Sequence, residues 1–83
     1  MAYQVVAAPS VREQLRAATP ELRGYVAGVV ALLRADPSAG TTAFPVVAGP
    51  AYQTIVLPEG RGFLDYQVVQ DRRLVVLVDL TWS

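Results

Sequence analysis

The residues of this chain that could do chemistry are arginines, carboxylates and aromatics, because the sequence contains no Cys, no His and no Lys. Without thiolate or imidazole ligands an ordinary zinc or copper site is excluded, and we expect no metal and no other cofactor. The only basic residues in the C-terminal, strand-like part are Arg61, Arg72 and Arg73. A guanidinium forms fork-shaped contacts with phosphates and carboxylates, so these three are the candidates for binding RNA or another phosphate.

Arg61 is the strongest of these candidates, because a glycine on either side gives its turn conformational freedom. If the chain cleaves RNA, Arg61 would stabilise the charge of the transition state, with Asp65 or Glu59 as the base. Tyr66 would orient the substrate or stack on a nucleobase. The alternative is that the three arginines are solvated turn charges that protect the edges of a sheet.

Aromatic side chains in the predicted strands offer a second kind of contact. Tyr52, Tyr66 and Trp82 could stack on nucleobases, although aromatic residues of sheets more often pack against neighbouring strands. We expect packing for Tyr52 and Tyr66, and Trp82 is the candidate anchor for a protein partner. Asp79 stands in an otherwise apolar segment, where we expect it to pair with an Arg or to lie at a sheet edge.

The composition predicts one domain over residues 1–83 with more apolar surface than it can bury. The net charge is zero, which argues against bulk binding to nucleic acid, and 53% of the residues are hydrophobic. Since small domains bury only about 60% of their unfolded surface, a partner should cover the surplus, either a second copy in a homodimer or a different chain. No signal-peptide pattern and no apolar run of about 20 residues is present, so we expect a cytoplasmic location and no membrane contact.

The N-terminal half predicts one strand and two helices. Tyr3–Ala8 is short and β-branched, as strands are. Ser10 and Glu13 match a capping box at the start of the first helix. Thr19, followed by a proline, predicts the start of the second helix, which Asp36–Pro37 ends. The apolar stripe of this helix has helical spacing and consists of Leu22, Tyr25, Val26, Val29, Val30 and Leu33.

The C-terminal half predicts three strands, Ala51–Leu57, Phe63–Gln70 and Leu74–Trp82, with a tight hairpin turn at Asp71–Arg73. The sequence does not decide whether the connection at 38–50 contains a further short strand. We expect three apolar residues of this connection, Phe44, Val46 and Val47, to lie under the helices. Because successive side chains of a strand point to opposite faces, we expect every second residue of the last strand to share one face: Leu74, Val76, Val78, Leu80 and Trp82.

The order of these elements is β-α-α-β-β-β, which predicts an α+β fold. Sequential strands with short turns form an antiparallel sheet, and a helical hairpin must bury its apolar stripe against one face of that sheet. The sequence therefore predicts two helices packed on one face of a mainly antiparallel sheet.

Segments spread over nearly the whole chain carry a family resemblance. They are the opening Met1–Val5 with Pro9, the helix end Leu32–Pro37 with its Asp-Pro stop, and the last hairpin, Tyr66–Asp71 followed by Leu74–Val78. In these segments the chain resembles the RelE/ParE superfamily of toxins from type II toxin–antitoxin pairs. That resemblance implies the same fold as the element order does.

The resemblance also implies a function. RelE-like toxins cut messenger RNA in the ribosome with Arg and Lys side chains, whereas ParE-like toxins poison DNA gyrase. An antitoxin that wraps around the toxin neutralises both groups. The first interpretation is therefore a toxin with an antitoxin as its protein partner. Its target would be ribosome-bound mRNA, cut by a metal-independent endoribonuclease, or DNA gyrase.

The sequence departs from the RelE-like pattern at positions that are usually basic. Phe63 stands where a principal catalytic Arg is expected, and no Arg or His follows Trp82. Gln53 and Ile55 stand in place of basic residues of the second strand of the family. An alternative is therefore a non-catalytic RelE-like module for binding or dimerisation, and a third interpretation is an unrelated small α+β domain.

Overall fold

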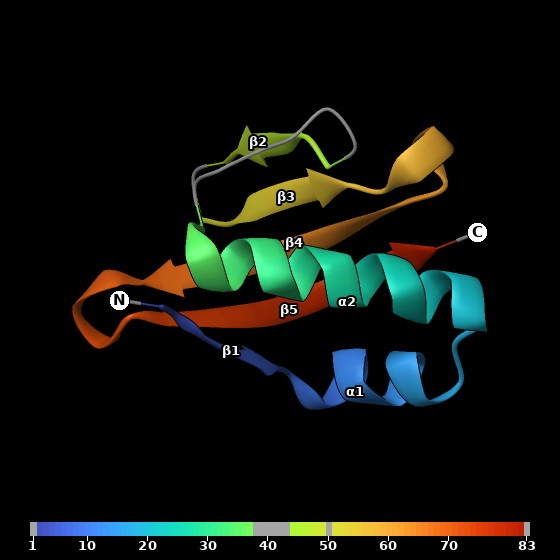
Figure 1. Cartoon of the computed structure of the whole chain (residues 1–83), viewed down its shortest axis with the longest axis horizontal. Coiled ribbons are helices and arrows are strands. Elements are labelled where there is room, and N and C mark those ends of the chain that lie inside the picture. The colour runs from blue at the N-terminus through green and yellow to red at the C-terminus, as the bar shows by residue number, and fades with distance from the viewer. Residues whose placement is uncertain (1, 38–43, 50, 83) are drawn as a thin grey trace.

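Two helices pack against one face of a five-stranded sheet (Figure 1). The computed structural model describes residues 2–37, 44–49 and 51–82. The predicted α+β class and element order are confirmed, and β2 is the additional strand that the sequence left open. In chain order the elements are β1 (Gln4–Ala7), α1 (Pro9–Arg16), α2 (Pro20–Ala35), β2 (Val46–Ala48), β3 (Gln53–Val56), β4 (Gly62–Val69) and β5 (Leu74–Trp82).

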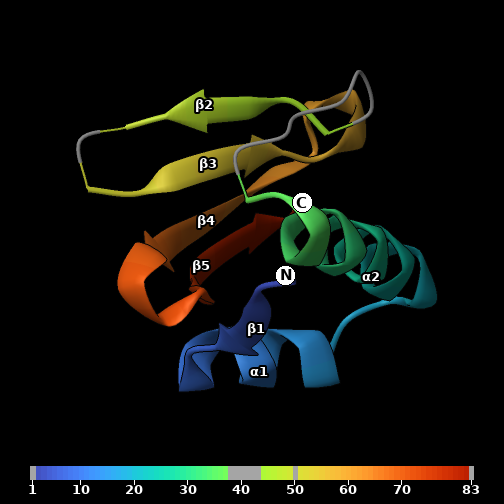
Figure 2. The ribbon, with the colours of Figure 1, turned by 60° about the vertical axis from the view of Figure 1, so that its left-hand side comes forward.

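The strands lie in the order β1-β5-β4-β3-β2, so the first and last strands of the chain are neighbours. β1 runs parallel to β5, and the other three pairs are antiparallel. A parallel pair needs a long crossover connection, and the helical hairpin belongs to that connection. α2 lies in front of β4 and β5 in Figure 1 and stands to one side of the sheet in Figure 2.

Helix α2 is the main cover of the sheet, and its start and its stripe are as predicted. The Oγ1 atom of Thr19 accepts a hydrogen bond from the Leu22 N–H at 3.3 Å, and a proline follows in the first turn. Proline lacks a backbone N–H, but in the first turn of a helix that N–H would have no hydrogen-bond partner within the helix, so nothing is lost. The stripe faces the sheet. Its buried members are Leu22, Val26, Val29 and Leu33, and its half-buried members are Tyr25 and Val30.

Helix α1 starts differently from the prediction. It begins at Pro9 with Ala8 as its N-cap, and no side chain caps it, so the predicted capping box of Ser10 and Glu13 is wrong. Proline has a fixed φ that suits the first helical position, so the helix begins before Ser10. Ser10 is then already inside the first turn and cannot serve as its cap.

The connection before β3 is only partly packed. Phe44 and Val46 pack against the core as expected, whereas the prediction for Val47 is wrong, because its side chain is exposed. Successive residues of a strand face opposite sides of the sheet, so only one of Val46 and Val47 can face the helices. Residues 38–43 and 50 of this predicted connection lie outside the described residues.

The core lies between α2 and the sheet face that α2 covers. Besides the stripe of α2 it contains Val11 of α1 and apolar residues from the three C-terminal strands and their connections. Tyr66 is the largest side chain in it that is fully buried. The other buried members are Ile55, Leu57, Leu64, Val75, Leu77 and Leu80.

A β-bulge in β5 changes which of its residues face the core. The register with β4 skips Val78, so this strand has one extra residue there. The alternation before the bulge is therefore out of phase with the alternation after it, and Val75, Leu77 and Leu80 are all buried. The bulge overturns the prediction of one shared face for Leu74, Val76, Val78, Leu80 and Trp82.

Candidate functional site

Arg61 lies at the end of the short turn Pro58–Gly60 (η1), where β3 passes into β4. Its guanidinium forms an ion pair with Glu21 in the first turn of α2 and lies over the Trp82 ring, 4.3 Å from the ring centroid. Trp82 also contacts Tyr25, with 5.9 Å between the ring centroids. Arg61 thus links the η1 turn to α2 and β5, and the candidate partner anchor Trp82 is half-buried in this cluster.

Tyr66 is buried on the helix-facing side of β4, as its predicted packing requires. Its hydroxyl donates a hydrogen bond to the Pro37 carbonyl at 2.6 Å and so joins the sheet to the end of α2. Burial, together with the nearby charge of Asp36, raises the pKa of Tyr66 to about 12. A buried hydroxyl that stays protonated holds the fold together, and its ring is not accessible to a nucleobase.

The structure does not bring the predicted catalytic residues together. Asp65 and Tyr66 are adjacent in β4, so their side chains lie on opposite faces of the sheet. Arg61 lies with Trp82 on the helix-facing side. Glu59, the alternative base, is exposed in the η1 turn. General acid–base chemistry needs the base and the charge-stabilising group around one reacting atom, and Asp65 lies on the other face of the sheet from Arg61 and Tyr66.

Arg72 and Arg73 lie at the other end of β4 from Arg61, in the turn Gln70–Arg72 (η2) and at the residue after it. The eight residues of β4 span roughly 25 Å at about 3.3 Å per residue. The Arg73 guanidinium lies 5.9 Å from the centroid of the Tyr3 ring. The three candidate arginines therefore do not form one phosphate-binding patch.

The sheet face turned away from the helices, called the outer face below, carries the exposed apolar side chains. Val6 is 38% exposed, Val47 56% and Phe63 47%, and each alternates with neighbours that face the core. Tyr52, directly before β3, follows the same alternation and is 48% exposed, so its predicted packing is wrong. No other large hydrophobic side chain of the described residues is comparably exposed. The outer face thus exposes four large apolar side chains, with polar residues of β3, β4 and β5 between them, and no helix covers it.

Two carboxylates lie next to each other on the outer face, one on the central strand β4 and one on β5. Asp65 of β4 is directly opposite Asp79 of β5. Asp65 Oδ1 accepts a hydrogen bond from Thr54 Oγ1 at 2.6 Å, and Asp79 Oδ1 accepts one from the Leu80 N–H at 2.9 Å. Within the described part of the chain neither carboxylate forms an ion pair, so the Arg partner expected for Asp79 is not found. The edge alternative fits better, because β1 pairs with β5 only as far as Leu77.

The sequence reasoning missed the outer face as a site. It predicted surplus apolar surface but did not locate it. The signal was present in β4, where Leu64 and Tyr66 suit the core and leave Phe63 and Asp65 on the other side. No sequence signal predicted that Asp65 lies directly opposite Asp79, because this position depends on the register of β4 with β5 and on the bulge in β5.

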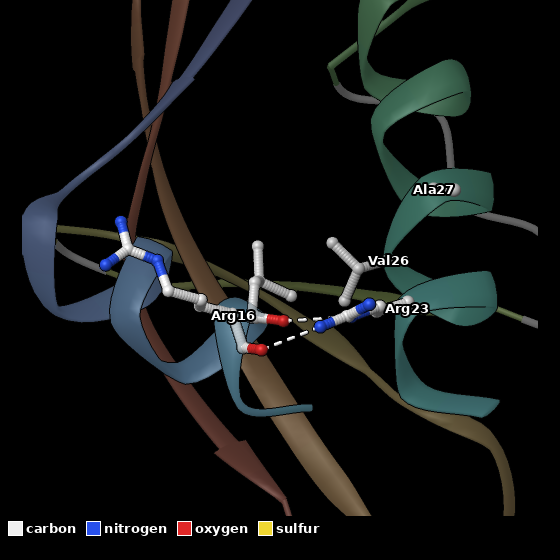
Figure 3. A pocket seen from close by; sticks show the side chains of 5 residues that line it. Arg16, Arg23, Val26 and Ala27 are labelled. Atoms are coloured by element: carbon white, nitrogen blue, oxygen red, sulfur yellow. Dashed lines mark hydrogen bonds between the residues drawn. The ribbon is translucent and has the colours of Figure 1, made fainter. Parts of the chain in front are cut away.

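An open groove of about 490 Å³ lies between α1 and α2 (Figure 3). The Arg23 side chain reaches across it and donates from Nε to the Leu15 carbonyl at 3.1 Å and from Nη2 to the Arg16 carbonyl at 2.6 Å. These bonds add donors to carbonyls at the C-terminal end of α1, where the Leu15 carbonyl also accepts a hydrogen bond from the Ala18 N–H at 3.2 Å. Arg23 therefore joins the two helices. The other residues that line the groove are Val26 and Ala27.

Comparison with known proteins adds no functional assignment. No protein-family model matches the chain, and no curated protein matches it. Across residues 2–37, 44–49 and 51–82, no group of three or more His, Cys, Asp or Glu side chains could hold a metal ion. In the same residues no helix is long and apolar enough to cross a membrane.

Proposed function

We propose that this chain is a non-catalytic protein-binding module with a RelE/ParE-like fold. The observation that carries the proposal is the position of the exposed large apolar side chains, since those of the described residues lie on the outer face: Val6, Val47, Tyr52 and Phe63. Large apolar side chains gathered on one uncovered face of a sheet are a candidate protein-interaction surface. In a toxin–antitoxin pair the partner on this surface would be the antitoxin.

The surroundings of the predicted catalytic residues support binding over catalysis. Asp65 and Tyr66 lie on opposite faces of the sheet, and the Tyr66 hydroxyl is used inside the core. The Arg61 guanidinium is engaged by Glu21 and by the Trp82 ring. Tyr66 and Arg61 thus have structural roles, and neither needs a substrate to explain its position.

Site-specific photocrosslinking in cells tests the proposal. A photoreactive phenylalanine analogue at Phe63 samples the outer face, and the same analogue at Ala31, an exposed residue of α2, is the matched control. We expect a discrete adduct from position 63 and none of the same mass from position 31. Mass spectrometry of the adduct identifies the bound chain. Equal adduct patterns from both positions, or none from position 63, would contradict the proposal.

The second candidate is the RelE/ParE-like toxin itself, with mRNA cleavage as its activity. The specific observation in its favour is the pairing of Arg61 with Trp82, because a guanidinium beside an indole offers a phosphate contact next to an aromatic surface. The Arg61 side chain is 37% exposed, so a phosphate could reach it from solvent.

A growth assay distinguishes this candidate from the binding module. If the chain is a toxin that acts through Arg61, expression of the chain alone arrests growth and Arg61→Ala relieves the arrest. The matched control is Glu21→Gln, which removes the same ion pair and keeps the guanidinium, and it should leave the arrest intact. Harmless expression of the natural chain, or arrest that persists in Arg61→Ala, would exclude this mechanism.

A further inference from the structure

We infer that the outer face binds a cationic amphipathic helix from a different protein, with an Arg or Lys of that helix placed between Asp65 and Asp79. The inference rests on the proposed binding function and deepens it, because it names the kind of partner. Three features of the outer face lead to it: its apolar residues, its opposed carboxylates, and the charge that those carboxylates would present to a second copy of this chain.

Apolar residues flank the two carboxylates on both sides. Along the strands, Phe63 and its neighbour Val56 lie on one side of Asp65, in a row that Thr81 completes. Val76 and its neighbour Val6 lie on the other side of Asp79, in a row that also contains Gln67. On the opposite face of the sheet α2 covers the apolar side chains of the strands with one apolar stripe. A helix with such a stripe would cover the outer face in the same way and give the sheet a second helical layer.

The opposed carboxylates specify the charge of that helix. Like charges directly opposite each other in a sheet destabilise the pair, and no described residue neutralises Asp65 or Asp79. Water screens them while the face is exposed. A partner that covered the face would remove this water, and covering two unpaired carboxylates is unfavourable unless a cation accompanies them. A guanidinium or an ammonium group within the apolar stripe supplies that cation, and a guanidinium can contact both carboxylates.

A second copy of this chain is a poor occupant of the same surface. In a twofold-symmetric dimer the same patch lies on both sides of the interface. Packing the centres of two outer faces together would place Asp65 and Asp79 of one copy against the same pair in the other copy. Four carboxylates without a cation would then be buried together, which electrostatics opposes. The partner with complementary charge is therefore a different chain.

Selection from a helix library tests the inference without knowledge of the natural partner. The library displays amphipathic helices as long as α2, which has 16 residues, with the centre of the apolar stripe randomised. It is selected on the natural chain and counter-selected on Phe63→Ser. We expect Arg or Lys to be enriched at the centre of the stripe. A synthetic peptide of the selected sequence should bind the double variant Asp65→Asn, Asp79→Asn at least about tenfold more weakly than it binds the natural chain, because the covered cation of the peptide would lose its charged partners.

The matched control is the double variant Glu59→Gln, Asp71→Asn, which removes the same charge from two exposed turn residues and should retain the affinity of the natural chain. The dissociation constant for the natural chain should also rise with salt, a measurement that needs no variant. Acidic or neutral residues at the stripe centre, or an affinity that salt and Asp65→Asn, Asp79→Asn leave unchanged, would overturn the cationic partner.

Sedimentation of the natural chain separates the failure of this inference from the failure of the proposed function. A homodimer that Phe63→Ser dissociates would overturn the cationic partner but retain the outer face as a protein-binding surface. If no helix is enriched, no dimer forms and position 63 gives no photocrosslink, both proposals fail. A selected basic helix with a monomeric chain supports both.

Discussion

At the start of β4, Gly62 has no room for a side chain. A Cβ atom at this position would lie 2.0 Å from the Thr81 carbonyl oxygen and 3.0 Å from the Trp82 Cα atom. Both are backbone atoms of β5, so only a shift of one strand could relieve the clash. Gly62→Ala should therefore lower the free energy of unfolding by about 3 kcal/mol, the upper part of the range for overpacked sites.

Urea unfolding followed by circular dichroism measures this effect. Gly24→Ala is the matched control, because a Cβ at Gly24 meets nothing within 4 Å and the residue lies within α2. Replacing a helical glycine by alanine should stabilise the chain by roughly 0.5–1 kcal/mol. Equal stability of Gly62→Ala and the natural chain would show that the two strands separate easily at this point.

The buried Tyr66 hydroxyl should make stability depend on alkaline pH. Its pKa is raised from 10.0 to about 12 in the folded chain. Between these values the unfolded chain loses the proton while the folded chain keeps it, so the free energy of unfolding falls as pH rises through this window. The slope reaches at most about 1.4 kcal/mol per pH unit. The stabilisation is fully present below pH 10 and is lost as pH passes about 12.

Urea unfolding at a series of pH values from about 9 to about 12, the raised pKa of Tyr66, tests this dependence. Tyr66→Phe should remove the part of the slope that Tyr66 causes. It should also cost about 1–3 kcal/mol at neutral pH, because the Pro37 carbonyl loses its donor. Tyr52→Phe, at an exposed position, is the control and should retain the slope. An identical pH dependence in Tyr66→Phe and the natural chain would contradict the argument.

At the scale of the elements, α1 depends on a side chain from α2. The helix has eight residues, too few for a stable isolated helix, and Arg23 satisfies carbonyls in its last turn. Arg23→Ala should speed amide hydrogen exchange in α1 and lower the free energy of unfolding by about 1 kcal/mol, as the loss of hydrogen bonds of this kind typically does. Hydrogen exchange by NMR resolves this change residue by residue.

Arg12→Ala provides the comparison for α1, because Arg12 is an exposed arginine of the same helix. Its effect on stability should stay within about 0.5 kcal/mol, as is usual for surface substitutions. Equal changes in the hydrogen exchange of α1 in Arg12→Ala and Arg23→Ala would contradict this argument. They would show that a positive charge near α1, rather than the carbonyl contacts of Arg23, stabilises the end of α1.

For the whole molecule, the arrangement of the sheet predicts an order of local stability. β4 and β5 lie in the interior of the strand order and contribute much of the buried core, whereas β2 is a short edge strand with two exposed residues. We expect the slowest hydrogen exchange at Leu64, Tyr66 and Leu77, close to the rate of global unfolding, and fast exchange throughout β2. Comparable protection of β2 and β4 in the purified chain would indicate that self-association covers this edge.

The sequence predicted the helices and strands well, because their signals are local. A capping Thr with a following Pro marked the start of α2, and its apolar spacing identified the buried stripe. For α1 two local signals competed, and the proline rather than Ser10 determined the helix start. The candidate site was predicted less well. Arg61, Asp65 and Tyr66 are close in sequence, but alternation along β4 and the ion pair with Glu21 separate their environments.

By itself the sequence determined the fold class, the element order and the absence of thiol and imidazole chemistry, because these depend on residue type and on spacing within single elements. The tertiary structure alone decided that Asp65 faces Asp79 on the uncovered side of the sheet. From Leu74 to Val78 every residue of β5 is apolar, so alternation carries no information on which residues point inward. The pairing with β4 and the bulge at Val78 fix that choice, and both involve residues distant in the chain.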